Sequence, residues 1–276
     1  MIKDLVVNLT VGESRGPAGD YAVSVAEAFG AHVAAIAFAH DPVVPPTLMG
    51  GIPVDFIESQ RAEAEASASA AIARFEEAAR RAGVSAESRL LAASISEGSD
   101  QFGRIARRFD LAVVGQAEPG KAMADELIGE TALFEAGRPV LFVPYIQKSG
   151  LELGKALVCW DGSRAAARAT ADAMPFLSRA GTIQVLIVAG ERGKSDEIPG
   201  ADLGHHLARH GLKVDVKRIV ATESDVANTI LSYVADTGAD FIVMGGYGHS
   251  RLREFILGGV TRSILEAMTV PTLMSH

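Results

Sequence analysis

Two clusters of glycine near the C-terminal end of the chain have the spacing of a backbone anion site. The apolar run Phe241–Met244 has the length and composition of a buried strand, and it ends at Gly245-Gly-Tyr-Gly248. Gly258-Gly259 then opens a segment with helical periodicity. Glycine lets the backbone approach an anion without a Cβ in the way, and the unpaired amides of a helix N-terminus carry partial positive charge. The pattern therefore predicts an anion site between this strand and this helix.

The elements that must position this site belong to the second of two similar halves. Val113-Val-Gly115 recurs as Val243-Met-Gly245, and Pro139-Val-Leu141 recurs as Pro271-Thr-Leu273. Each half alternates predicted strands and helices, including a helix to Arg108 that Ser96–Asp100 is expected to cap. This alternation favours parallel strands joined by right-handed crossovers. We therefore expect an α/β fold of two tandem doubly wound open-sheet domains, with five parallel strands each. The expected domains cover residues 1–146 and 154–276, and ligands are expected at the carboxyl ends of the strands.

The composition excludes several classes of protein. Apolar residues make up 48% of the chain and charged residues 22%, as in folded globular proteins. The net charge of −8 argues against nucleic acid or anionic lipid as the main partner. No apolar run reaches the roughly 18 to 20 residues of a membrane span, and the N-terminus lacks the pattern of a signal peptide. We expect a soluble cytoplasmic protein.

The glycine spacing resembles a known family signature. Gly245, two residues, Gly248, nine residues and Gly258 resemble the nucleotide-binding motif of the universal stress protein family. Leu257-Gly-Gly-Val-Thr261 is similar to the family's Leu-Gly-Ser-Val-Ser/Thr, and Val158-Cys-Trp-Asp161-Gly-Ser163 is similar to its Val-Asp-Gly-Ser. Because the resemblance covers both halves, it implies a tandem-type member with Rossmann-like sheets of strand order 3-2-1-4-5.

The resemblance implies an adenine nucleotide, ATP first among them and with Mg²⁺ as a candidate companion, in the second half. Asp161 would face the adenine or ribose, and Val188 would offer backbone groups to the adenine. The remaining implied contacts surround the ribose and the phosphates: Gly245, Gly248, Gly258, Gly259 and Val260, with Arg251 and Thr261 as further candidates for phosphate contacts. Gly259 stands where the family usually has Ser or Thr, which removes one hydrogen bond worth about 1 kcal/mol. The alternative is that these glycines serve only turn geometry and close helix packing.

The first half departs from this pattern. Glu118 replaces the second glycine, Gly129 is followed by Glu130, and Thr10 stands in the place of Asp161. Carboxylates close to a phosphate would repel it. We therefore expect no nucleotide in the first half.

Four other groups of residues invite a chemical interpretation. Gly115-Gln-Ala-Glu-Pro-Gly-Lys121 satisfies the Gly-x-x-x-x-Gly-Lys pattern, but Ala122 stands where a P-loop needs Ser or Thr. His205, His206 and His210 could pair on a metal but are better explained as a solvated helix face. Ser163 is expected to cap a helix rather than act as a nucleophile. The single cysteine, Cys159, is expected to be a buried strand residue rather than a reactive thiol.

The leading hypothesis is a stress-response protein whose second half binds ATP or a related adenine nucleotide as a regulatory ligand. We expect no catalytic residue, no metal site and at most slow ATP hydrolysis. The alternatives are a scaffold that acts only through protein partners and a weak ATP-hydrolysing enzyme on the same fold. The apolar segment Pro42–Gln60 is expected either to cover a groove or to bind a partner. The edge strands at 140–143 and 272–275 are expected to pair with each other or with another subunit. The resemblance implies a pseudo-dimer within one chain and leaves a homodimer open.

Overall fold

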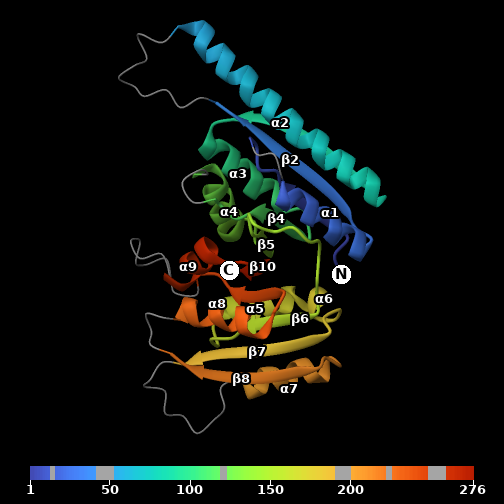
Figure 1. Cartoon of the computed structure of the whole chain (residues 1–276), viewed down its shortest axis with the longest axis vertical. Helices are drawn as coiled ribbons and strands as arrows, with labels where there is room; N and C mark the ends of the chain where they lie inside the picture. Colours follow the sequence, from blue (N-terminus) through green and yellow to red (C-terminus); the bar gives the residue numbers. More distant parts are fainter. Residues whose placement is uncertain (13–15, 42–52, 119–122, 190–199, 222–225, 248–258) are drawn as a thin grey trace. The chain divides into compact units, whose positions relative to one another are not determined.

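The computed structural model describes residues 1–12, 16–41, 53–118, 123–189, 200–221, 226–247 and 259–276 (Figure 1). By their contacts these residues form two compact units. The N-terminal unit covers Ile2–Arg138, and the C-terminal unit covers Pro139–His276 together with Met1. The finer boundaries expected at 1–146 and 154–276 stay predictions.

The N-terminal unit has parallel strands in the order β3-β2-β1-β4. The strands are β1 (Asp4–Asn8), β2 (His32–His40), β3 (Ala86–Ala93) and β4 (Leu111–Gly115). The helices are α1 (Pro17–Phe29), α2 (Val54–Ala82), α3 (Ile95–Ala106) and α4 (Met123–Glu135). α1 packs with α2, and α3 packs with α4, so that the sheet lies between two helical layers (Figure 1).

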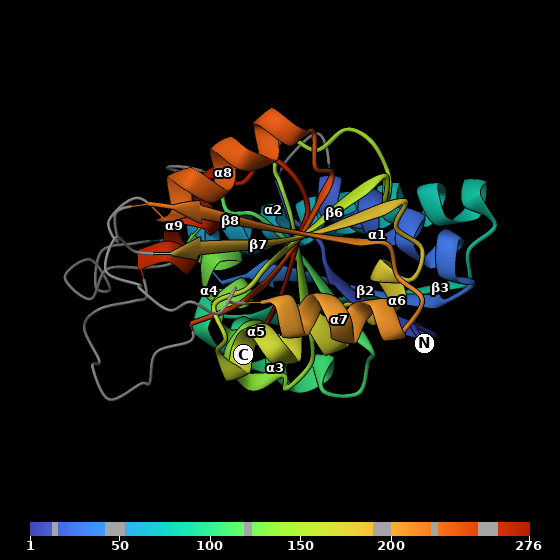
Figure 2. The same ribbon diagram turned by 90° about the horizontal axis from the view of Figure 1, so that it is seen from below.

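The C-terminal unit repeats this plan, and its parallel strands follow the order β8-β7-β6-β9-β10. The strands are β6 (Lys155–Cys159), β7 (Thr182–Ala189), β8 (Val214–Val220), β9 (Phe241–Gly245) and β10 (Thr272–Ser275). The helices are α5 (Arg164–Asp172), α6 (Met174–Leu177), α7 (Ala201–Arg209), α8 (Val226–Thr237) and α9 (Gly259–Ala267). Figure 2 shows α8 and α9 on one face of this sheet and α5 and α7 on the other. The doubly wound α/β fold is therefore confirmed.

The last strand of the first half joins the C-terminal unit. β5 (Val140–Val143) pairs antiparallel with β10, with Leu141 opposite Leu273. All four residues of β5 are buried. The prediction that these two strands pair with each other is confirmed.

Burial along the strands follows their positions in the sheets. Four of the five β9 residues are buried, as a parallel strand covered on both faces requires. β3 and β8 each pair with one strand only among the described residues, and both expose about every second residue. In the C-terminal core, Phe176 of α6 stacks on Phe241 of β9 with 5.0 Å between ring centroids.

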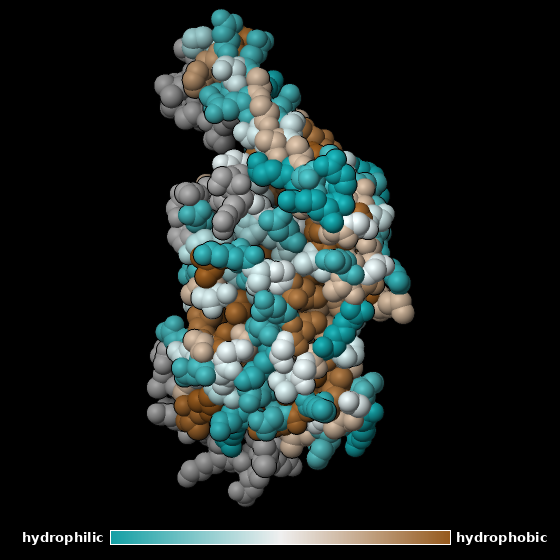
Figure 3. Space-filling model, turned by 45° about the vertical axis from the view of Figure 1, so that its right-hand side comes forward, coloured by the Kyte–Doolittle hydropathy of each residue, from teal (hydrophilic) through white to brown (hydrophobic). Residues whose placement is uncertain are grey.

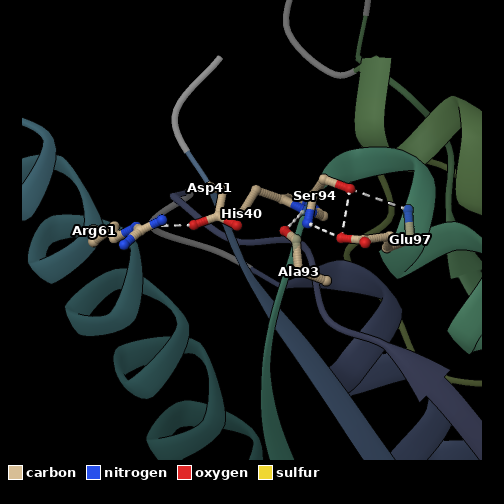
Figure 4. A network of polar contacts seen from close by, with 6 residues as sticks. All are labelled: His40, Asp41, Arg61, Ala93, Ser94 and Glu97. Carbon is tan, nitrogen blue, oxygen red and sulfur yellow. Dashed lines mark hydrogen bonds and ion pairs between the residues drawn. The ribbon is translucent and has the colours of Figure 1, made fainter. Parts of the chain in front are cut away.

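Helix α3 begins earlier than the sequence predicts. Its N-cap is Ser94, and a reciprocal pair of hydrogen bonds joins Ser94 and Glu97 (Figure 4). The predicted cap within Ser96–Asp100 is therefore wrong, because these residues already lie inside the helix. The capping box gives hydrogen-bond partners to the backbone amides of Ser94 and Glu97 at the start of the helix. Its hydrogen bonds lower the pKa of Glu97.

The described part of the Pro42–Gln60 segment belongs to the start of a long helix. α2 starts at Val54, and its first turns expose Val54 (67%) and Phe56 (55%) to solvent. The surface around α2 is largely hydrophilic in the view of Figure 3. Arg61 of this helix pairs with Asp41 at 3.0 Å (Figure 4). Residues 42–52 of the predicted Pro42–Gln60 segment lie outside the described residues.

Candidate functional site

A pocket of about 190 Å³ lies in the C-terminal unit, where β6, β7 and β9 end and α9 begins. The parallel register sets these ends side by side, since Cys159 of β6 pairs with Leu186 of β7 and with Met244 of β9. Residues from α8 close the pocket on one face of the sheet. Its lining residues are Cys159, Trp160, Asp161, Leu186, Val188, Val226, Ile230, Met244, Gly245, Tyr247, Gly259, Val260 and Thr261.

Six residues singled out from the sequence line this one pocket: Asp161, Val188, Gly245, Gly259, Val260 and Thr261. They come from three strand ends and one helix start, which lie far apart in the chain. The other three, Gly248, Arg251 and Gly258, lie outside the described residues. The geometry therefore gathers all of the predicted residues that it describes.

Gly245 has a packing role of its own. A Cβ added to it would lie 2.5 Å from the backbone nitrogen of Ala166 and 2.7 Å from the carbonyl carbon of Ala165. These atoms belong to the first turn of α5, which crosses directly over the end of β9. Close helix packing by itself therefore requires glycine at this position.

Asp161 stands at the rim of the pocket in an ordered turn. The amide of Ser163 donates to Oδ1 of Asp161 at 2.9 Å, and Gly162 between them has a φ of 77°. Oγ of Ser163 accepts from the amide of Ala166 at 3.1 Å, which confirms its predicted role as the N-cap of α5. The Asp161 carboxylate is exposed at a fixed place and is suited to accept hydrogen bonds from ligand hydroxyls.

The first turn of α9 presents backbone amides without side-chain obstruction. Nothing lies within 4 Å of a Cβ built on Gly259, so this face of the helix start is open. The first turn of α9 carries no acidic residue. These two features are what an anion at a helix N-terminus requires.

Thr261 has a protein partner. Its Oγ1 accepts a hydrogen bond of 3.1 Å from the amide of Tyr247, and both residues are buried. The bond joins the exit of β9 to the first turn of α9. Thr261 therefore lines the pocket with its hydroxyl already engaged with the backbone.

The apolar lining of the pocket was missed at the level of sequence. It consists chiefly of Trp160, Leu186, Val226, Ile230 and Met244. The i, i+4 spacing of Val226 and Ile230 marks one face of α8, and Trp160 directly precedes Asp161 at a strand end. An aromatic ring and aliphatic side chains suit a flat, weakly polar group such as a nucleobase.

Cys159 does not offer a nucleophile. Desolvation raises the pKa of its thiol to about 12, and the nearby Asp161 carboxylate acts in the same direction. The thiol therefore stays protonated at neutral pH, and Cys159 is the strand residue that the sequence predicts, although it is half-buried rather than fully buried.

The remaining predicted motifs lie elsewhere. Residues 119–122 of the P-loop-like segment are outside the described residues. The rings of His206 and His210 lie edge to face with centroids 4.9 Å apart at the end of α7. The described ranges hold no group of three or more His, Cys, Asp or Glu residues that could bind a metal ion. In the same ranges, no helix is both long and apolar enough to cross a membrane.

Comparison with known proteins shows a family likeness in the C-terminal part of the chain. Residues 152–276 match the model of the universal stress protein family. The C-terminal part of this chain is therefore similar to members of that family. The match includes every element that forms the pocket.

One solved structure extends the likeness in fold to nearly the whole chain, and other relatives match parts of it. A universal stress protein from Archaeoglobus fulgidus aligns over 98% of this chain and 94% of its own, with 16% identity and a TM-score of 0.74. Universal stress protein Slr1230 from Synechocystis is 26% identical over 174 residues, which cover 60% of this chain and 57% of that protein. A universal stress protein solved in complex with cAMP aligns with 52% of this chain and 97% of its own, at 18% identity and a TM-score of 0.35.

Proposed function

We propose that the C-terminal unit binds an adenine nucleotide, with ATP as the first candidate, and that the protein acts as a nucleotide-responsive regulator in a stress response. The observation that carries the proposal is the convergence of an apolar pocket, the Asp161 carboxylate and the open first turn of α9. Each of these three features matches one part of a nucleotide.

The base takes the apolar part of the pocket, between Trp160 and the aliphatic residues of β7 and α8. The ribose hydroxyls donate to Asp161 at the rim. The phosphates lie against the amides of Gly259 and Val260, where the helix terminus favours negative charge. Mg²⁺ enters with the phosphates, because this ion is commonly held by substrate phosphates and water.

The test is thermal unfolding of the full chain with ATP, with and without Mg²⁺. A ligand at about 100 times its dissociation constant stabilises the fold by about 2.7 kcal/mol, so millimolar ATP is expected to raise Tm measurably. A chain that shows no shift in Tm and no binding by calorimetry contradicts the proposal and favours a scaffold that acts only through protein partners.

A charge variant gives the matched control. Gly259→Glu places a carboxylate in the open space beside the helix start without a steric clash, and an acidic residue there suits the α9 dipole. We expect ATP to bind at least tenfold more weakly through charge repulsion, while adenosine binding stays within about twofold. Gly259→Gln has nearly the same size without the charge and is expected to bind ATP almost as the unmodified chain does. An equal loss of ATP binding in both variants would point to steric blockage instead.

A further inference from the structure

The backbone at Tyr247 is held in an unfavourable conformation. Its φ is 48°, and it is the one non-glycine residue with a positive φ in the part of the chain that the structure describes. The left-handed region disfavours a bulky side chain about tenfold in population. Tyr247 is nevertheless buried, with 7% of its surface exposed, and it lines the pocket.

Two neighbouring contacts hold the chain at this point. The amide of Gly246 donates to the carbonyl of Ser275 at 2.9 Å, and Nδ1 of His276 lies 3.0 Å from the carbonyl oxygen of Gly246. Gly246, just before Tyr247, is therefore held by Ser275 of β10 and by His276, which follows β10. On the other side, the amide of Tyr247 donates to Oγ1 of Thr261 at 3.1 Å.

We propose that Thr261 is a positioning residue, whose hydroxyl holds Tyr247 in the left-handed conformation and so keeps the wall of the nucleoside pocket formed. This role is separate from the direct phosphate contact predicted for Thr261, because a hydroxyl oxygen that accepts from an amide can still donate its own hydrogen, and it rests on the proposed nucleotide binding. The bond spans 14 residues and is buried, with 5% of Thr261 exposed. Losing the acceptor would remove this hydrogen bond from a buried backbone amide, which costs stability.

The positioning role makes a prediction that a phosphate contact does not. A pocket that is formed only part of the time weakens every ligand by the same factor, whether or not the ligand has phosphates. A lost phosphate contact weakens ATP and leaves adenosine unchanged. The comparison of these two ligands therefore separates the two roles of the same hydroxyl.

The experiment compares Thr261→Val, which has nearly the same shape, with Thr261→Ser, which keeps the hydroxyl. Calorimetry is expected to show ATP and adenosine both weakened about tenfold in Thr261→Val and within twofold of the unmodified chain in Thr261→Ser. Weakening of ATP without weakening of adenosine, or no change for either ligand, would overturn the proposal.

Hydrogen exchange of the Tyr247 amide tests the same bond without any ligand. We expect protection in the unmodified chain and in Thr261→Ser, and faster exchange in Thr261→Val; equal protection in all three overturns the proposal. A chain that binds neither ATP nor adenosine overturns the proposed function, and the exchange measurement then still decides whether Thr261 holds Tyr247.

If Thr261→Val unfolds, the Tyr247→Gly background serves as the second test. Glycine accepts this φ without penalty, so the chain that carries both Tyr247→Gly and Thr261→Val is expected to fold, and a chain that stays unfolded would overturn the proposal.

Discussion

The two halves of the chain differ most where the fourth strand of each leads to the next helix. In the C-terminal unit, α9 begins at Gly259 with no acidic residue in its first turn. In the N-terminal unit, the first turn of α4 already carries Asp125 and Glu126. The side-chain amide of Asn8, at the end of β1, donates to Oδ1 of Asp125 at 3.1 Å. The first turn of α9 therefore leaves its backbone amides without a nearby carboxylate. In the first turn of α4, the carboxylates of Asp125 and Glu126 already interact favourably with the dipole of that helix.

This contrast changes the reason for expecting no nucleotide in the first half. The sequence predicts that Glu118 and Glu130 stand at the phosphate position. Gly129 and Glu130 instead lie inside α4, away from its first turn, and Gly129 is buried. Asp125 is the carboxylate that joins the helix start to the strand end. The two halves therefore share one α/β plan and differ in where this helix begins and in the charge that its first turn carries.

The largest effect is expected from adding a methyl group to the glycine that ends the fourth strand. Gly245→Ala should destabilise the C-terminal unit by about 3 kcal/mol, because the new Cβ would lie 2.5 Å from a backbone nitrogen of α5 that cannot rotate away. Gly115→Ala is the matched control in the other half. Its Cβ would lie 3.1 Å from Oγ1 of Thr10, a side-chain atom that can shift, so we expect a loss of about 1 kcal/mol or less. Urea unfolding measures both, and equal losses would contradict the packing role of Gly245.

A smaller effect is expected from placing a hydroxyl group at position 259, where the universal stress protein family usually has Ser or Thr. Gly259→Ser fits into open space and adds one hydrogen-bond donor beside the phosphates. We expect ATP to bind about fivefold more tightly, since one hydrogen bond contributes about 1 kcal/mol, while adenosine binding is unchanged. Calorimetry with both ligands checks this. Tighter binding of adenosine would mean that the serine acts on the pocket and not on the phosphates.

The smallest effect is expected at the amino-terminal ends of the strands, opposite the pocket. In both halves an aspartate accepts hydrogen bonds from backbone amides where the first strand begins: Asp110 accepts from Lys3 and Asp4, and Asp240 accepts from Gly154 and Lys155. Strand β6 has Lys155 where β1 has Asp4. Burial raises the pKa of Asp4, with Asp110 and Glu87 adding repulsion and His32 opposing them.

Asp4→Asn should therefore raise Tm by about 1 °C at pH 7. A raised pKa in the fold means that the native state binds the proton more tightly, so the unmodified chain loses this stability as the pH rises through the pKa of the folded state. The advantage of Asn should vanish below the pKa of unfolded aspartate. Thermal unfolding at pH 7 and near pH 3.5 checks the sign. A benefit that persists at low pH would show that the charge of Asp4 is not its cause.

Part of the site could be predicted from local pattern. The glycine spacing and the strand-to-helix order predicted the start of α9, and the family resemblance implied Asp161 and Val188. All three lie together because a parallel sheet brings the carboxyl ends of its strands to one edge. The apolar lining from α8 was not predicted, since helical spacing marks a buried face without saying what it is buried against. The cap at Ser94 was missed because Ser96, Ser99 and Asp100 compete for the same role in sequence.

By itself the sequence determined the doubled α/β plan, through the periodicity of its apolar residues and the recurrence of its strand ends. It also determined that the helix α9 begins with a glycine, whose backbone amide has no Cβ beside it. Only the tertiary structure decided that Gly245 must be glycine for α5 to pack, and that Thr261 binds the backbone of Tyr247. The reason is physical: a steric limit and a hydrogen bond between distant residues exist only once packing has brought them within a few ångströms of each other.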